Sequence, residues 1–220
     1  MINQQFVPQA VLFDMDGLML DTEGPVLPFW YEIMEKYAYP LDEETLFRTI
    51  GVPAYTTEKI LKEKYGTDFP YDKITEELVK MVQDDNEKNG IPQKQGLITL
   101  LDHLDNMGIP KAVATSTERE KALWKLKHAG IFNRFSVIVT VNDVKHGKPA
   151  PDLFLAAAEK LGKAPELCIG FEDSTAGLQS LAAAGVKSVF IKDILTPPED
   201  VLKTVWRQFS NLAEAVELFR

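Results

Sequence analysis

The chain has 220 residues, 45% of them hydrophobic, which is enough to bury the core of one domain with a smaller inserted domain. Its formal net charge of −9 argues against a nucleic-acid partner, because binding a phosphate backbone requires a clustered positive field. The sequence has no apolar stretch long enough to span a membrane, and residues 1–9 lack a signal-peptide pattern. We therefore expect a soluble, cytoplasmic protein in which the single cysteine, Cys168, is a buried core residue.

The first predicted element is a strand at residues 10–13, and it is followed at once by Asp14 and Asp16. Gly17 permits the chain to turn there, because it lacks a Cβ atom. Two crowded carboxylates repel each other, so we expect a cation beside them, and Mg²⁺ prefers such oxygen ligands. Taken alone, the aspartates could be ordinary turn residues. An EF-hand loop is excluded, because Met19 stands where its glycine should be.

Residues 23–95 are predicted to form a small all-helical domain. Apolar residues recur there at helical spacing, and the clearest stripe comprises Phe29, Trp30, Ile33, Met34 and Tyr37. Within this region, the turn at residues 48–52 offers Arg48 as a candidate substrate-binding residue, with a plain surface loop as the alternative.

From Gly96 onward, strands and helices alternate. Strands are predicted at residues 111–114, 136–141, 167–170, 188–191 and 205–209, and helices at 97–107, 118–129, 152–161, 176–184 and 212–219. Alternation of this kind predicts an α/β fold: a doubly wound, mostly parallel, Rossmann-like sheet. We assign residues 1–22 and 96–220 to this core domain and residues 23–95 to the inserted helical domain.

Polar side chains follow the predicted strands, at the sheet edge where ligands of such folds bind. The second strand leads to Thr115 and Ser116, the third to a loop that contains Lys148, and the fourth to Glu172 and Asp173. With the two aspartates after the first strand, they supply a nucleophile, an acid/base, metal ligands and hydrogen-bond donors. This combination indicates phosphoryl transfer.

Some of these residues have alternative interpretations. Thr117 could form a helix capping box with Glu120, and Asp173 could be the N-cap of the helix that follows it. Lys145 is a rival to Lys148 in the same loop.

Four segments together resemble the motifs of the haloacid dehalogenase-like superfamily, more closely its β-phosphoglucomutase-like phosphatase branch. They are Asp14-Met15-Asp16-Gly17, Thr115, Lys148-Pro149 and Gly170-Phe171-Glu172-Asp173-Ser174. The resemblance covers essentially the whole chain, including a helical cap domain inserted after the first motif.

The resemblance implies that Asp14 attacks phosphorus to form an aspartyl-phosphate, while Asp16 acts as acid and then as base. It implies a Mg²⁺ ion held by Asp14, Asp16 through its backbone carbonyl, and Asp173, with Glu172 as a further candidate ligand. Thr115, Ser116 and Lys148 would bind the substrate.

The expected function is that of a Mg²⁺-dependent, monomeric phosphatase that hydrolyses a small phosphate ester. Sugar phosphates are the commonest substrates of the family that the chain resembles. A phosphomutase is the alternative. Val26 disfavours it, because the mutases that the chain resembles carry a histidine at that position. A signalling module switched by phosphorylation of an aspartate is a third possibility, which the large helical insert disfavours.

Overall fold

The computed structural model describes residues 6–50, 52 and 54–219, and the chain divides into two compact units. The core unit comprises Met1–Asp21 with Pro92–Arg220, and the helical unit comprises Thr22–Ile91. In the part of the chain that the structure describes, none of the helices combines the length and apolar character that crossing a bilayer requires.

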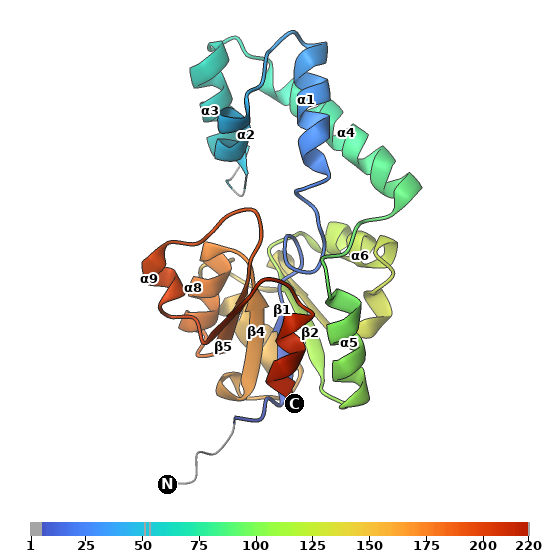
Figure 1. The fold of residues 1–220 in the computed structure, drawn as a ribbon, viewed down its shortest axis with the longest axis vertical. Coiled ribbons are helices and arrows are strands. Elements are labelled where there is room, and N and C mark those ends of the chain that lie inside the picture. Colours follow the sequence, from blue (N-terminus) through green and yellow to red (C-terminus); the bar gives the residue numbers. More distant parts are fainter. Residues whose placement is uncertain (1–5, 51, 53, 220) are drawn as a thin grey trace. The chain divides into compact units, whose positions relative to one another are not determined.

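The core unit is built on a parallel sheet with the strand order β3-β2-β1-β4-β5-β6 (Figure 1). Its strands are β1 (Ala10–Phe13), β2 (Lys111–Thr115), β3 (Val137–Thr140), β4 (Cys168–Glu172), β5 (Lys187–Ile191) and β6 (Arg207–Phe209). This topology confirms the predicted doubly wound α/β fold. Because the order reverses at β1, that strand ends at the switch point where such sheets bind ligands.

Strand β1 lies at the centre of the sheet, and all four of its residues are fully buried. Phe13 pairs with Val113 of β2 on one side and with Phe171 of β4 on the other. The rings of Phe13 and Phe171 stack with centroids 5.2 Å apart. This register brings Asp14, the next residue after β1, between the ends of its two neighbours.

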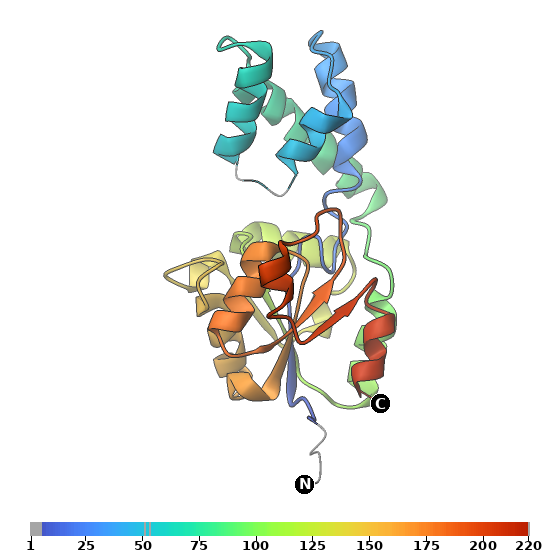
Figure 2. The same ribbon diagram turned by 60° about the vertical axis from the view of Figure 1, so that its left-hand side comes forward.

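Helices cover both faces of the sheet. They are α5 (Leu97–Asn106), α6 (Arg119–His128), α7 (Asp152–Lys160), α8 (Thr175–Ala183) and the short α9 (Glu199–Leu202), with 3₁₀ turns η1 (Phe132–Arg134), η2 (Val141–Asp143), η3 (Pro165–Leu167) and η4 (Glu214–Phe219). Helices α7 and α8 pack on one face through an apolar cluster that includes Leu12, Phe154 and Leu181. Figure 2 shows α5 and η4, which contact each other, on the opposite face.

Several predicted elements of the core unit differ in the structure, and the predicted strand 205–209 is shorter there, as β6 (Arg207–Phe209). The segment 212–219 is mainly a 3₁₀ turn rather than an α-helix, and the side chain of Glu214 accepts hydrogen bonds from Ser210 and Asn211 just before it. Strand β4 runs on to Glu172, beyond the predicted end at Gly170, because Glu172 pairs in register with Phe190 of β5. Glu172 is therefore the last residue of a strand and not part of a loop.

The helical unit consists of α1 (Val26–Lys36), α2 (Glu43–Thr49), α3 (Ala54–Tyr65) and α4 (Tyr71–Asn89). Its core is a cluster of buried apolar residues that includes Ile33, Leu61 and Phe69. Aromatic rings close one side of this core, with the centroid of Tyr39 4.9 Å from that of Phe69. Tight apolar packing of this kind explains how so small a helical unit is held together.

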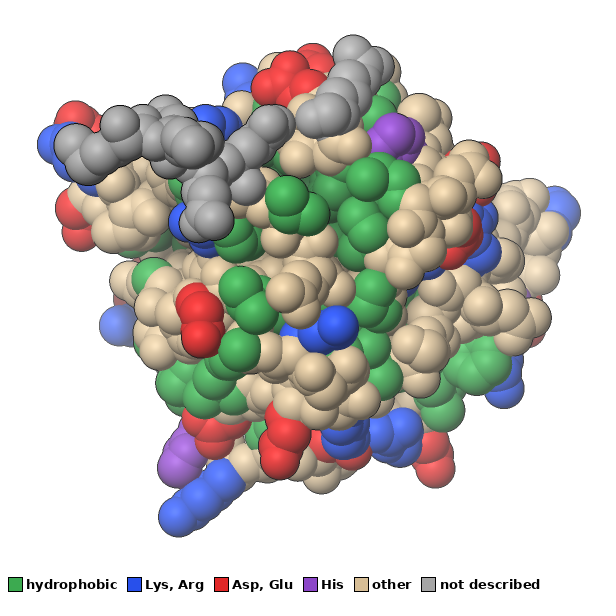
Figure 3. Space-filling view, turned by 90° about the horizontal axis from the view of Figure 1, so that it is seen from below, with side chains coloured by type: hydrophobic (Ala, Val, Ile, Leu, Met, Phe, Trp, Pro, Cys, Tyr) green, Lys and Arg blue, Asp and Glu red, His purple; other side chains and the backbone are tan. Residues whose placement is uncertain are grey.

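The surface of the core unit at the edge where the strands begin carries scattered charges. Figure 3 shows basic and acidic side chains interspersed there, with hydrophobic atoms between them. Neither sign of charge dominates that view.

Candidate active site

Lys148 joins the ends of β1 and β4. Its ammonium group donates to Asp14 Oδ1 and, at 2.6 Å, to Glu172 Oε1. The Lys148 side chain is only 5% exposed, and its Nζ lies 4.8 Å from the centre of the Phe154 ring of α7. Buried charges require partners, so this lysine and the two carboxylates hold one another in place. Lys145, the rival from the same loop, is exposed.

Glu172 is anchored through both of its carboxylate oxygens. While Oε1 accepts from Lys148, Oε2 accepts from the backbone N–H groups of Asp173 (2.9 Å) and Ser174 (2.8 Å) and from the Ser174 hydroxyl (2.9 Å). The carboxylate packs directly against Gly177, where a Cβ atom would lie 1.7 Å from Oε1. Only glycine fits at this close approach, so the first turn of α8 is shaped around Glu172.

The turn after β1 places Asp16 and brings Asp173 close. It is closed by hydrogen bonds from Gly17 N to Leu20 O (2.9 Å) and from Met19 N to Met15 O (3.0 Å). Gly17 has a φ of +85°, and a Cβ atom there would lie 2.5 Å from Asp173 Oδ2. The glycine therefore serves two needs, a left-handed backbone and room for a carboxylate.

Asp173 is not the N-cap of α8. That position is held by Ser174, whose side chain accepts from Gly177 N at 3.1 Å. The capping alternative is thus wrong, because the strand and the loop run one residue further than it requires. Asp173 Oδ1 is buried and has no hydrogen-bond partner among the described residues. An orphaned buried oxygen of this kind is suited to an ion that the protein itself does not supply.

Like charges crowd the site. Burial, followed by the neighbouring carboxylates of Glu172, Asp14 and Asp193, raises the pKa of Asp173 far above its usual range. Burial also raises the pKa of Asp14, and the attraction of Lys148 only partly offsets this. Lys148 responds in the opposite sense: burial lowers its pKa, but the carboxylates of Asp14 and Glu172 outweigh burial and raise it overall. The carboxyl groups of Asp14, Glu172 and Asp173 thus share one ammonium group, and a divalent cation would allow all three to be ionised together.

The residues present fit a Mg²⁺ ion for which the protein supplies only some of the ligands. Within residues 6–50, 52 and 54–219, no three or more His, Cys, Asp or Glu side chains are gathered closely enough to enclose a metal by themselves. Mg²⁺ does not need such a cage, because it is usually bound through one or two carboxylates with water and substrate phosphate as its other ligands. Asp14 and the orphaned Asp173 meet that requirement.

The end of β2 contributes hydroxyl groups. The Thr115 side chain is buried and accepts from Thr117 N at 3.0 Å, whereas Ser116 is exposed. Thr117 does not form the capping box that its spacing to Glu120 suggests. Helix α6 begins after Glu118 without a side-chain cap, and the Thr117 hydroxyl instead donates to Asp16 Oδ2 at 2.6 Å. The tertiary contact is preferred over the local one.

Sequence reasoning missed several charged residues at this edge of the sheet. Lys125 of α6 donates to Asp16 Oδ1 at 2.5 Å. Asp193, two residues beyond β5, pairs with Lys94 at 2.5 Å and lies close to Asp173. The rule that selected the other candidate residues, those just past an apolar strand, would also have selected Asp193 had it been applied to β5. No local signal marks Lys125, because only folding brings it to Asp16.

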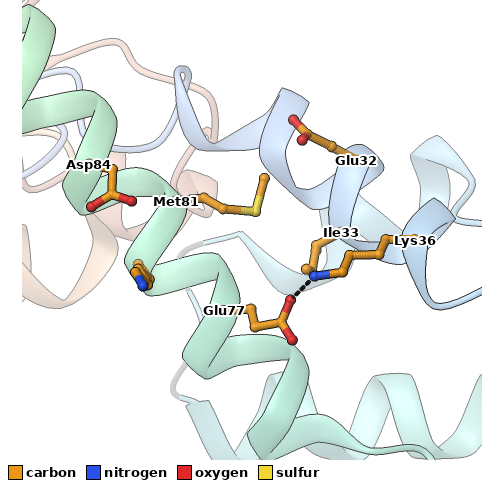
Figure 4. A pocket seen from close by; sticks show the side chains of 7 residues that line it. Glu32, Ile33, Lys36, Glu77, Met81 and Asp84 are labelled. Carbon is orange, nitrogen blue, oxygen red and sulfur yellow. Dashed lines mark hydrogen bonds and ion pairs between the residues drawn. The ribbon is translucent and has the colours of Figure 1, made fainter.

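Arg48 belongs to the other unit. It is an exposed residue in the last turn of α2, and part of its predicted turn, residue 51, lies outside the described residues. The helical unit has its own groove between α1 and α4, lined among others by Ile33, Met81 and Lys80. Figure 4 shows Glu77 reaching across it to pair with Lys36. These two groove charges are thereby matched within the unit.

Known proteins are similar to this chain over most of its length. The model of the haloacid dehalogenase-like hydrolase family matches residues 11–191. The chain is 30% identical to the phosphorylated carbohydrates phosphatase of Thermotoga maritima over 83% of this chain and 84% of that protein. It is 35% identical to hexitol phosphatase A of Escherichia coli over 80% of each protein.

A solved structure from Thermotoga maritima that carries the provisional name β-phosphoglucomutase superposes with a TM-score of 0.82. It is 26% identical and covers 96% of this chain and 97% of the other. The matched family model, the relatives and this fold agree with the resemblance carried by the four motifs. The chain therefore belongs to the haloacid dehalogenase-like hydrolases, in their β-phosphoglucomutase-like branch.

Proposed function

We propose that this protein is a Mg²⁺-dependent phosphatase that hydrolyses a small phosphorylated metabolite through an aspartyl-phosphate on Asp14. The observation that carries the proposal is the buried group of Asp14, Lys148 and Glu172 beside the orphaned oxygen of Asp173. A buried ammonium group next to a carboxylate nucleophile, with a free carboxylate oxygen for a cation, suits the transfer of a phosphoryl group, whose charge needs stabilisation.

In the first half of the reaction, a carboxylate oxygen of Asp14 forms a bond to phosphorus as the ester bond to the leaving oxygen breaks. Asp16 gives its proton to that leaving oxygen. In the second half, Asp16 takes a proton from a water molecule, which attacks the phosphorus, releases phosphate and restores Asp14. Lys148 and Thr115 bind the oxygens of the phosphoryl group as it moves.

Asp14 and Asp173 would hold the Mg²⁺ ion, with the Asp16 carbonyl as a further ligand. When bound, the ion offsets the repulsion between a carboxylate and a phosphate dianion. Because both oxygens of Glu172 already accept from protein donors, we assign Glu172 to the positioning of Lys148.

The substrate class that we propose is a sugar or polyol phosphate, in line with the names of the two relatives. The helical unit would then act as a cap that selects the substrate, and Arg48 is a candidate contact. Val26 lines a pocket of this unit with Trp30 and Ile50, and its apolar side chain offers no acid or base. That favours transfer of the phosphoryl group to water over transfer to a second sugar position.

The experiment is a phosphate-release assay on a panel of sugar and polyol phosphates, with Mg²⁺ and with a chelator. We expect turnover that needs Mg²⁺ and falls by on the order of 10³-fold or more in Asp14→Asn, which keeps the shape of the side chain but removes the nucleophile. Turnover that survives in Asp14→Asn would refute the proposal. Formation of an isomeric sugar phosphate without free phosphate would establish the phosphomutase alternative, for which the similarity to the Thermotoga structure speaks.

A further inference from the structure

Asp16 is held from two sides by residues that lie about a hundred positions away in the sequence. Its Oδ1 accepts from Lys125 Nζ at 2.5 Å, and its Oδ2 accepts from Thr117 Oγ1 at 2.6 Å. These are the two side-chain hydrogen bonds that the carboxylate accepts within the described part of the chain. We propose that Lys125 and Thr117 are positioning residues that aim Asp16 for proton transfer to the leaving group, an inference that rests on the proposed function.

The backbone of the turn leaves only the Asp16 side chain to be positioned. Hydrogen bonds from Gly17 N to Leu20 O and from Leu20 N to Met15 O fix the main chain around it. Two rotatable bonds then decide where the carboxylate points. A donor on each oxygen restrains both bonds, and placement within a fraction of an ångström is what proton transfer requires.

Thr117 contributes its hydroxyl to Asp16 rather than to its own helix. Threonine just before a helix ordinarily caps it, yet α6 begins after Glu118 without a side-chain cap. The Thr117 hydroxyl donates to Asp16 instead. The local sequence thus gives up a standard stabilising contact in favour of one at the site.

Lys125 differs from the other lysines of α6. It follows the fully buried Ala122 by three residues and precedes the fully buried Leu126, so it lies at the edge of the packed side of the helix. The side chains of Lys125 and Asp16 are 26% and 27% exposed. Lys121, on the same helix, pairs with Glu118 at 3.1 Å, and those side chains are 73% and 62% exposed. Lys121 is therefore a matched control.

If Lys125 and Thr117 position Asp16, the loss of kcat/KM on changing them should depend on the leaving group of the substrate. An alkoxide leaves poorly unless a proton arrives as the ester bond breaks, whereas p-nitrophenolate leaves unaided. The ratio kcat/KM reports the steps up to departure of the leaving group and not the later attack of water. Misplacing Asp16 should therefore lower kcat/KM for an alkyl phosphate and spare kcat/KM for p-nitrophenyl phosphate.

The test compares Lys125→Met, Thr117→Val, Thr117→Ser and Lys121→Met, in the full chain with Mg²⁺, on sorbitol 6-phosphate and p-nitrophenyl phosphate. If the hexitol phosphate is not turned over, the best alkyl phosphate of the panel replaces it. We expect Lys125→Met and Thr117→Val to lose about 10- to 100-fold in kcat/KM on the alkyl phosphate and less than about threefold on the aryl phosphate. Thr117→Ser keeps the hydroxyl. Its kcat/KM on both substrates, and that of Lys121→Met, should stay near the value of the parent protein.

Several results would overturn the inference. They are equal losses on both substrates, no loss on either, or a selective loss in Lys121→Met. Thermal unfolding of each variant shows whether it is folded. Lys125→Met and Thr117→Val each remove one of the two contacts, so either of them, if folded, decides the test. Activity in Asp14→Asn would instead refute the proposed function, so the two failures are distinguishable.

Discussion

The two units of this protein place their charges differently. In the core unit, Lys148, Asp14 and Glu172 are buried and joined to one another at the end of the sheet. In the helical unit, pairs such as Lys36–Glu77 and Lys62–Glu58 lie at the surface around an apolar interior. Burying charge costs free energy, whereas a solvated pair costs and contributes little. Under the proposed function, the core unit would retain its buried charges for chemistry. The helical unit, by contrast, depends on apolar packing for its stability.

The largest expected effect is that of removing the buried ammonium group. Lys148→Met should lower turnover by on the order of 100-fold or more, because Asp14 and the phosphoryl oxygens lose their cationic partner. It should also destabilise the core unit by about 3 kcal/mol, since two buried carboxylates are left facing each other. Lys145→Met, at an exposed position in the same loop, is the control. If phosphate release and urea midpoints are affected equally by both changes, burial does not distinguish these lysines.

The second prediction concerns the apolar interior of the helical unit. Phe69 is 3% exposed, packs edge-to-face against Tyr39 and stacks on Tyr65. Phe69→Ala should lower the stability of this unit by about 3–4 kcal/mol, because it removes packed atoms and leaves a cavity. Hydrogen exchange should rise for the amides of α3 and α4 but not for those of β1. Phe47→Ala, at an exposed position on α2, should change neither, and equal effects of the two changes would contradict this assignment of the core.

A smaller effect on stability is expected when low pH protonates Asp143, at the surface of the core unit. Burial opposes ionisation of Asp143, but hydrogen bonds from Arg119 and Thr140 outweigh it and lower the pKa of Asp143 to about 2. Because the folded pKa lies below the unfolded value, this contribution is complete above about pH 4 and is lost as pH falls toward 2.

Because the ion pair of Arg119 and Asp143 is partly solvated, it contributes less than about 1 kcal/mol to the free energy of unfolding. Urea midpoints between pH 5 and pH 2.5 measure it, with Asp143→Asn as the comparison. The parent protein should lose more stability over this interval than the variant. Parallel curves would show that Asp143 contributes nothing.

The smallest effect is expected from removing the charge of Glu77 in the groove of the helical unit. Glu77 accepts from Lys36 and from the Tyr37 hydroxyl, but the Lys36 side chain is 62% exposed. Glu77→Gln should leave the thermal unfolding temperature unchanged within error, because Gln keeps an acceptor for Tyr37 and solvent replaces the lost charge pair. A marked drop in the unfolding temperature would mean that surface ion pairs stabilise this unit after all. It would also remove the contrast with the core unit.

Much of the fold could be predicted from the sequence, because its signals are local. The apolar run at residues 10–13 and the alternation after Gly96 indicated the parallel sheet, and the aspartates after β1 indicated where a ligand would bind. The ends of elements were less predictable. Strand β4 continues to Glu172 because it pairs with β5, and Thr117 turns away from its helix toward Asp16. In both cases a contact from elsewhere in the chain overrides the local preference.

The sequence by itself determined the family, the order of strands and helices, and the residue types offered at the sheet edge, since these depend on the spacing of neighbours along the chain. Only the tertiary structure decided which charges meet. It joined Lys148 to Asp14, left Asp173 Oδ1 without a partner among the described residues, and brought Lys125 to Asp16. The reason is physical: hydrogen bonds and ion pairs require atoms to approach within about 3 Å, and residues a hundred positions apart do so only once the sheet and its helices have packed.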